Sequence, residues 1–322
     1  MLFLPAILFG QNSSIEDLVD RGNKLYDVGK YIDAVAEYQQ ALSIDKNAPA
    51  PNYEIANTYL ALEKYDKAIY YSDKVISLNK EFVDKAYTLK GTAQDLMQQH
   101  DAALETYKEG IKHYPNYYLL NYNLALDLLN KKQYPYAAYY SSKAIQEHPQ
   151  HAGSHLILAT CMYQEGQRIP AILAYYYFLL LEPGSKRSEG ALAILNKLLR
   201  NGISKEGDKK TNDEFVPADA ALSLLASQQF GDKNADQPEY RQFYEVTNSF
   251  FKMMYELSVS KKIKDIWWDF YVPFFDNLQK SDNMEAYCYY ISQSGNNAVV
   301  KKWVKDNQSS VEKLAQWYEV YY

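Results

Sequence analysis

Small residues recur along the first half of the chain at an almost constant interval, and this period constrains the fold more than any other feature. The most regular set consists of Ala34, Ala68, Ala103, Ala137 and Ala171, spaced 34 or 35 residues apart. A second set stands twelve residues earlier in each interval: Gly22, Ala56, Gly91, Ala125 and Ala159. Two antiparallel helices approach closely only where side chains are small. The period therefore predicts a helical hairpin that is repeated five times.

Other residues of each interval agree with a repeated hairpin. Pro115, Pro149 and Pro183 follow the expected second helices and prevent their continuation. Large residues such as Tyr38 and Tyr107 are placed to fill the space beside the small ones.

The stretches "GKYIDAVAEYQQALSID" (29–45), "DAALETYKEGIKHYPN" (101–116) and "YPYAAYYSSKAIQEHPQ" (134–150) resemble the tetratricopeptide repeat. The resemblance implies helix–turn–helix units that stack into a superhelix. It covers five units, at residues 15–48, 49–82, 84–117, 118–151 and 152–185. The sequence departs from the pattern by one inserted residue near Val83. Polar Arg21, Lys90 and Gln94 stand at usually apolar positions, and Phe178 stands at a position that is usually occupied by a small residue.

The stretch "AILAYYYFLLLEPGS" (171–185) contains eleven consecutive residues without a charge. A membrane span needs about 20 such residues, so we expect the second helix of unit five instead. A helix that is apolar on all sides is buried on all sides. Residues 186–322 show helical spacing in segments 188–199, 217–230, 239–258, 263–278, 283–294 and 311–322, with polar loops at 201–214 and 231–239. We therefore predict an all-α fold, a solenoid of helical hairpins followed by a helical C-terminal domain (186–322) packed on the last repeat.

The N-terminal segment 1–14 carries an apolar run from Leu2 to Phe9 before a polar stretch, which indicates a signal peptide or an apolar tail. Export to the periplasm or cell envelope is the expectation, with a cytoplasmic location as the alternative. A net charge of −6 argues against nucleic acid as a partner. Cys161 and Cys288 form no CxxC pair and are expected as buried thiols. The oligomeric state is left open.

No motif for catalysis or for a cofactor is found in the sequence. His148, His151 and His155 are the nearest approach to a metal site, but Pro149 and the break between units separate them, so we expect solvent-exposed linker histidines. Trp267 and Trp268 could form a stacking platform for a glycan or small ligand, whereas core packing is the favoured alternative. We predict no metal, no cofactor and no enzymatic activity.

The resemblance implies that the first helix of each unit lines a concave groove for a protein or peptide partner. The corresponding positions are Val19, Asn23, Tyr26, Tyr53, Asn57, Leu60, Thr88, Thr92, Asp95, Tyr122, Leu126, Leu129, Leu156, Thr160 and Tyr163. The protein's own C-terminal part could instead cover the apolar half of this groove. Chaperone-binding members of the family hold a terminal carboxylate with paired basic and Asn residues. Asn23 and Lys85 fit that pattern, but Val19, Glu54 and Leu89 do not, so we expect a scaffold without this clamp.

Overall fold

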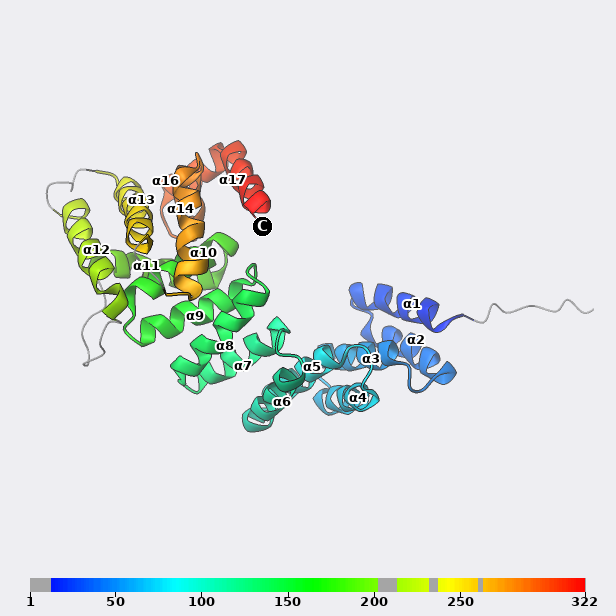
Figure 1. The fold of residues 1–322 in the computed structure, drawn as a ribbon. Coiled ribbons are helices and arrows are strands. Elements are labelled where there is room, and N and C mark those ends of the chain that lie inside the picture. The colour runs from blue at the N-terminus through cyan, green and yellow to red at the C-terminus, as the bar shows by residue number, and fades with distance from the viewer. Residues whose placement is uncertain (1–12, 202–212, 232–236, 260–262, 322) are drawn as a thin grey trace, which may run out of the picture. The chain divides into compact units, whose positions relative to one another are not determined.

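A computed structural model describes residues 13–201, 213–231, 237–259 and 263–321, and all regular structure in these ranges is helical (Figure 1). The helices are α1 (Ile15–Asp27), α2 (Tyr31–Ile44), α3 (Pro49–Ala61), α4 (Tyr65–Leu78), α5 (Val83–Leu96), α6 (His100–His113), α7 (Tyr118–Asn130), α8 (Tyr134–Glu147), α9 (Ala152–Gln164), α10 (Arg168–Leu181), α11 (Lys186–Asn201), α12 (Val216–Gln229), α13 (Glu239–Ser258), α14 (Val272–Lys280), α15 (Met284–Ile291), α16 (Ala298–Asp306) and α17 (Gln308–Tyr321). A short 3-10 helix, η1 (Asp213–Phe215), precedes α12, and a π-helical turn, η3 (Trp267–Tyr271), precedes α14.

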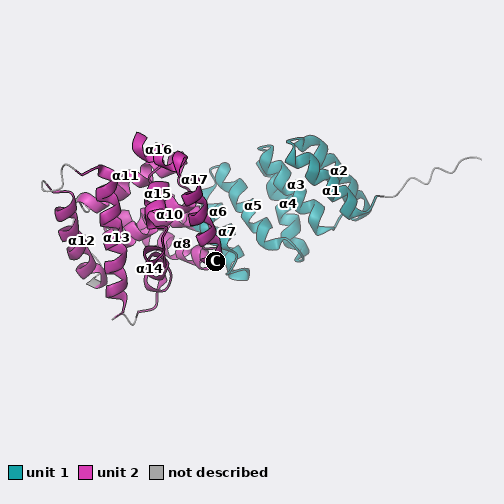
Figure 2. Ribbon diagram, turned by 90° about the horizontal axis from the view of Figure 1, so that it is seen from above, with its two compact units in different colours: residues 1–124 teal, residues 125–322 magenta. Residues whose placement is uncertain are grey.

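The chain divides into two compact units, residues 1–124 (unit 1) and 125–322 (unit 2), which Figure 2 colours separately. In unit 1, α1 pairs with α2, α3 with α4, and α5 with α6, while α3 also packs beside both α1 and α5. In unit 2, α9 packs against α8 and α10. The predicted all-α fold of consecutive helical hairpins is thereby confirmed.

The small residues of the period lie where the helices cross. The alanines at positions 34, 68, 103, 137 and 171 are all completely buried. A Cβ atom added to Gly22 would lie 2.2 Å from Cε1 of Tyr38, and one added to Gly91 would lie 2.2 Å from Cε1 of Tyr107. The small residue of the first helix thus makes room for the ring of the second helix, which is the packing that the sequence predicts.

The turn inside each hairpin contains one residue with a positive φ angle. These residues are Gly29 (76°), Glu63 (57°), Gln98 (62°), Lys132 (57°) and Gly166 (75°). Their spacing of 34 or 35 residues repeats that of the alanines, so the five turns have one geometry. Glycine adopts this left-handed conformation without strain, whereas the other three residues adopt it at a cost.

In unit 1, each polar residue that stands at a usually apolar position of the repeat is paired with a polar residue on a neighbouring helix. Arg21 forms an ion pair with Glu37 at 2.9 Å, and Lys90 forms one with Asp73 at 2.7 Å. The amide oxygen of Gln94 accepts a hydrogen bond from the Thr106 hydroxyl at 2.7 Å. Each polar residue therefore keeps the helix contact that an apolar residue would make.

Helix α10 is buried along almost its entire length, because helices of the C-terminal region enclose it. It packs against α9, α11, α12, α15 and η3. The ring of Tyr176 lies among aromatic residues, at a centroid distance of 5.0 Å from Phe251 and 6.0 Å from Phe275. Its hydroxyl is 2.7 Å from the Thr247 hydroxyl, and its carbonyl accepts a hydrogen bond from Tyr287. The C-terminal region therefore covers the uncharged stretch, as predicted, and Phe178 occupies a small-residue position because this cover surrounds it.

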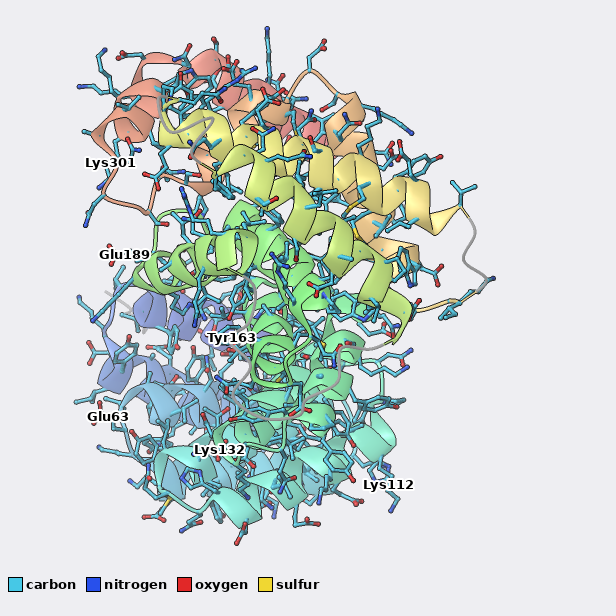
Figure 3. The ribbon with its side chains drawn as sticks, turned by 90° about the vertical axis from the view of Figure 1, so that its left-hand side faces the viewer. Glu63, Lys112, Lys132, Tyr163, Glu189 and Lys301 are labelled. Atoms are coloured by element: carbon cyan, nitrogen blue, oxygen red, sulfur yellow. The ribbon has the colours of Figure 1, made fainter. Side chains whose placement is uncertain are left out.

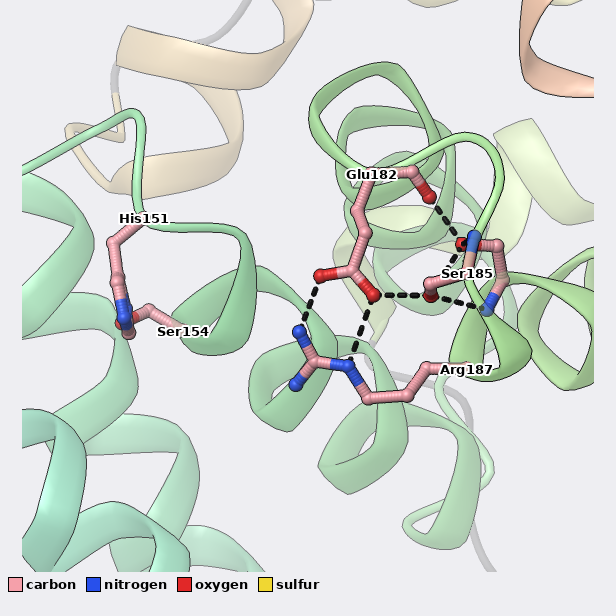
Figure 4. A network of polar contacts seen from close by, with 6 residues as sticks. His151, Ser154, Glu182, Ser185 and Arg187 are labelled. Atoms are coloured by element: carbon pink, nitrogen blue, oxygen red, sulfur yellow. Dashed lines mark hydrogen bonds and ion pairs between the residues drawn. The ribbon is translucent and has the colours of Figure 1, made fainter. Parts of the chain in front are cut away.

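A polar network ends α10 and begins α11 (Figure 4). The Glu182 carboxylate accepts hydrogen bonds from the Ser185 hydroxyl and the Arg187 guanidinium. The hydrogen bond and charge of Arg187 hold the pKa of Glu182 below its usual value. Ser185 and Ser188 also bond each other's backbone N–H groups at 3.3 Å, which caps the first turn of α11.

Buried Arg168 ties α10 to the next two helices. Its guanidinium donates to the carbonyls of Leu198 and Leu199 at the end of α11, and to Asp219 and Ser223 on α12. The four acceptors compensate for the burial of the charge.

The C-terminal region differs from expectation in two places. The segment 263–278 begins its helix only at η3 and continues as α14. Helix α16 was not predicted, because its three lysines and its polar surroundings conceal a short apolar face around buried Val300. Residues 1–12 and most of both predicted polar loops lie outside the described residues, and the domain boundaries at 185 and 186 stay predictions.

Candidate partner-binding surface

We use the name first-helix face of unit 1 for the predicted lining residues of α1, α3 and α5 together with their half-buried neighbours Glu54 and Phe82. Val19, Asn23, Tyr26, Tyr53, Asn57, Leu60, Thr88, Thr92 and Asp95 are all half-buried. Three of them, Val19, Tyr26 and Leu60, also pack against the core around Ile55 and Tyr38. Tyr122 on α7 is half-buried as well. The face is therefore a supported surface whose side chains remain partly open to solvent.

Buried tyrosines of the second helices hold polar side chains of this face. The Tyr38 hydroxyl donates to Oδ1 of Asn23 at 2.7 Å, and the Tyr107 hydroxyl donates to Oδ2 of Asp95 at 2.9 Å. These are the same two tyrosines that fill the space beside Gly22 and Gly91. The packing that builds the hairpin thus also orients groups on its open face.

An aromatic pair lies at the start of α3 and α5. The rings of Tyr53 and Phe82 are stacked, with a centroid distance of 5.0 Å and an interplanar angle of 11°. The ammonium of Lys85 lies 5.8 Å and 5.4 Å from the two ring centroids. Phe82 has a φ of 66°, a left-handed conformation at the place of the predicted insertion. This strained backbone directs its ring onto Tyr53.

The electrostatics of the face are acidic. Burial raises the pKa of Glu54, and Lys85 opposes this shift. Burial, with the negative charges of Glu54 and Asp84, raises the pKa of Tyr53 to about 12. Burial and the charge of Glu54 also raise the pKa of Tyr38.

In unit 2, the predicted lining residues on α7 and α9 form a second surface. Leu126 is 37% exposed, and Leu129, Leu156, Thr160 and Tyr163 are half-buried. Thr160 donates its hydroxyl to the Leu156 carbonyl at 2.7 Å. At the edge of the surface, Lys197 of α11 donates to the Tyr163 hydroxyl at 3.2 Å (Tyr163 is labelled in Figure 3). The C-terminal region therefore reaches Tyr163 and leaves Leu126 accessible.

The expectation of three exposed linker histidines is wrong for His155, which is completely buried. Its Nε2 donates to the Pro149 carbonyl at 2.8 Å, so Nδ1 accepts from the Tyr271 hydroxyl at 2.6 Å. Its ring stacks on Tyr177 at 4.3 Å. Burial lowers the pKa of His155 to about 3. Both ring nitrogens are engaged within the protein, which explains the histidine as a structural residue.

His155 occupies the place of an asparagine in other repeats. Asn52 donates its side-chain amide to the Lys46 carbonyl six residues earlier, and Asn121 does the same to Pro115. His155 bonds the carbonyl six residues earlier as well, so it keeps the tether to the preceding loop. The second ring nitrogen adds a contact to Tyr271, a residue of the C-terminal region.

The two tryptophans of the alternative ligand site take part in packing. Trp268 is buried, stacks on Phe215 at 5.3 Å and donates its indole N–H to Glu214. Trp267 is half-buried and stacks on Tyr271 at 5.3 Å. The packing alternative therefore holds for Trp268, whose ring is not presented to a ligand.

Sequence reasoning missed two residues of the first-helix face, Glu54 and Phe82. In the sequence, Glu54 stands out only as a mismatch to the carboxylate clamp, although that mismatch already indicates a position that faces the groove. The sequence also indicates the insertion near Val83, but a period of 34 or 35 residues does not reveal a left-handed residue. Only the coordinates show that it brings an aromatic ring to Tyr53.

Comparison with known families agrees with this geometry. A TPR repeat model matches residues 22–63, and a tetratricopeptide repeat model matches residues 51–82 and 84–117. The chain contains tetratricopeptide repeats. The repeats of unit 1 are thus those that family models match, and the hairpins of unit 2 follow the same period.

Several curated relatives match the repeat segment. Hsp70-Hsp90 organizing protein 2 of Arabidopsis thaliana is 33% identical over 97 residues, which are 30% of this chain and 17% of that protein. Hsp70-Hsp90 organizing protein 1 of Glycine max is 35% identical over 97 residues, again 30% and 17% of the two chains. The match therefore spans less than a fifth of these relatives.

Among solved structures, the fold is similar to PilF of Pseudomonas aeruginosa. The TM-score is 0.52 at 18% identity, over 71% of this chain and 96% of that chain. A likeness at this identity concerns the fold alone. In the described part of the chain, no helix is both long enough and apolar enough to cross a bilayer.

Proposed function

We propose that the protein is a non-catalytic scaffold that binds a protein or peptide partner through the first helices of its repeats. The observation that carries the proposal is the burial pattern of these helices. Their predicted lining residues stay half-buried or exposed, whereas the small residues and tyrosines that oppose them are completely buried. A helix face that the fold supports but does not cover is available to a partner.

The two surfaces offer different chemistry to that partner. The face of unit 1 presents amides and phenols, among which Asn57 can bond a peptide backbone. The surface of unit 2 presents Leu126, Leu129 and Leu156, whose burial would contribute most of the affinity. We infer that unit 2 offers a partner mainly apolar contacts and that unit 1 offers mainly polar ones.

The matched relatives are named for Hsp70 and Hsp90, but the same mode of recognition is not proposed for this chain. Glu54 is a carboxylate at a position where the clamp needs an amide. Leu89 is buried in α5 at a position where the clamp needs a basic residue. A terminal carboxylate would meet repulsion at the first position and no cation at the second.

The test is Leu126→Asp, which places a charge on the apolar surface of unit 2. Leu224→Asp on α12 is the matched control, since Leu224 is 62% exposed and lies on another helix. Partners retained from extracts of the native host are quantified by mass spectrometry, and helical content is compared by circular dichroism. We expect Leu126→Asp to lose partners that the control keeps, at equal helical content. Equal retention by both variants would overturn the assignment of this surface.

We also propose export to the periplasm or cell envelope, from the apolar run Leu2–Phe9 in the sequence. Fractionation of the native host with N-terminal sequencing of the mature chain tests this. An uncleaved chain in the cytoplasm would reject it.

A further inference from the structure

We infer that the first-helix face of unit 1 selects a peptide segment with a basic side chain, Lys or Arg, which is seated at Glu54. This inference rests on the proposed function and adds the chemical class of the partner. It follows from three properties of the face: a half-buried carboxylate without a hydrogen bond or ion pair, a local excess of acidic groups and aromatic rings beside it.

Glu54 is a half-buried carboxylate on α3 that receives no hydrogen bond or ion pair from the residues that the structure describes. Such a charge is destabilised by its partial removal from water. A cation from a bound partner would compensate for this loss, because charge-assisted hydrogen bonds are among the stronger polar contacts.

Acidic groups outnumber basic ones around Glu54. The negative charge of Asp27 acts on Glu54 itself, and that of Asp84 acts on Tyr53. Like Glu54, these two aspartates form no hydrogen bond or ion pair through their carboxylates within the described ranges. The opposing cation is Lys85, whose charge affects Glu54 more than that of Asp27 does, although Lys85 and Glu54 form no ion pair within 4.0 Å. An acidic peptide would therefore be repelled, and a basic one attracted.

Aromatic rings beside Glu54 favour a cation further. Burial raises the pKa of both Tyr26 and Tyr53, and the charge of Glu54 contributes to both shifts. The stacked Tyr53–Phe82 pair already holds the ammonium of Lys85 at distances typical of cation–π contacts. A guanidinium can bond a carboxylate and stack on a ring at the same time, so arginine is the best fit.

The probes are two peptide libraries of about ten residues each, matched in all positions except a fixed central residue, which is Arg in one and Glu in the other. Binding of the full chain to both is measured at low and high salt by fluorescence anisotropy. Glu54→Gln removes the charge and keeps the shape. Glu63→Gln is the matched control, an exposed glutamate in the turn between α3 and α4 (Figure 3).

We expect the Arg library to bind at least tenfold more tightly than the Glu library, with the difference reduced by salt. Glu54→Gln should weaken binding of the Arg library about tenfold, and Glu63→Gln should leave it unchanged. Binding of both libraries with equal affinity, or equal binding by Glu54→Gln and the wild type, would overturn the inference while the proposed function stands. If neither library binds, peptide recognition by this face is itself refuted.

Discussion

The substitution Gly22→Ala tests the packing on which the repeats are built. The added Cβ atom would lie 2.2 Å from Cε1 of Tyr38 and 2.7 Å from its Cδ1 and Cζ. The ring cannot withdraw easily, because Tyr38 is completely buried and its hydroxyl is bonded to Asn23. The second repeat (49–82) solves the same crossing differently, with Ala56 and Ser72 at the equivalent positions, also sixteen residues apart and both completely buried.

The expected change in the free energy of unfolding of Gly22→Ala follows from two opposing contributions. Overpacking of this severity costs about 2–3 kcal/mol. Alanine in a helix interior is favoured over glycine by about 1 kcal/mol. In the wild-type background, Gly22→Ala should therefore lower the free energy of unfolding by about 1–2 kcal/mol. In the Tyr38→Ser background the ring is absent, so Gly22→Ala should raise the free energy of unfolding by about 1 kcal/mol.

The assay is a double-mutant cycle followed by urea unfolding. Circular dichroism at 222 nm reports on both units, whereas tryptophan fluorescence reports on unit 2. All four tryptophans lie in that unit: Trp267, Trp268, Trp303 and Trp317. A transition seen by circular dichroism alone identifies unit 1. An effect of Gly22→Ala with the same sign and size in both backgrounds would refute the proposed pairing of small and large residues.

Three further predictions concern the turns and the buried polar groups. Gly29→Ala should lower stability by about 1 kcal/mol through its φ of 76° alone, since the added Cβ meets no atom within 4 Å; an unchanged urea midpoint would contradict this. The pKa of His155 is lowered to about 3 when folded and is near 6.5 when unfolded, so its stability contribution is present above pH 6.5 and is lost as the pH falls. The wild type should lose about 2 kcal/mol more than His155→Asn between pH 6.5 and 4.5, and equal slopes by tryptophan fluorescence would reject the buried neutral ring. Arg168→Met leaves Asp219 and the carbonyls of α11 without their donor, so unit 2 should lose about 3 kcal/mol, and a loss below 1 kcal/mol would show that water replaces the guanidinium.

The sequence predicted the repeats well because the constraint is local and periodic. Ala103 and Tyr107 lie where a tight crossing requires a small and a large residue, and their positions follow from spacing alone. The absence of charged residues in most of α10 likewise predicted that another part of the chain covers this helix. Which residues do so was not predictable, since Thr247 and Tyr287 lie 71 and 111 residues beyond Tyr176.

Predictions for single polar residues were less reliable. His155 was expected to be exposed, because a helix break after Pro149 indicates a linker. It is buried because its position in the period is that of Asn52 and Asn121, whose amides bond the preceding loop. The repeat spacing already contains this equivalence, but the prediction from the sequence did not use it. Glu54 required the structure, since only the structure shows a half-buried carboxylate without a hydrogen bond or ion pair.

The most direct test of the central claim is site-specific photo-crosslinking in the native host. A photoreactive residue replaces Asn57 or Leu126 on first helices, and in matched variants Ile32 or Tyr139, which are exposed on second helices. We predict that partners are captured from the first-helix positions and not from the second-helix positions. Capture only from Ile32 or Tyr139 would contradict the claim that the first helices form the binding surface.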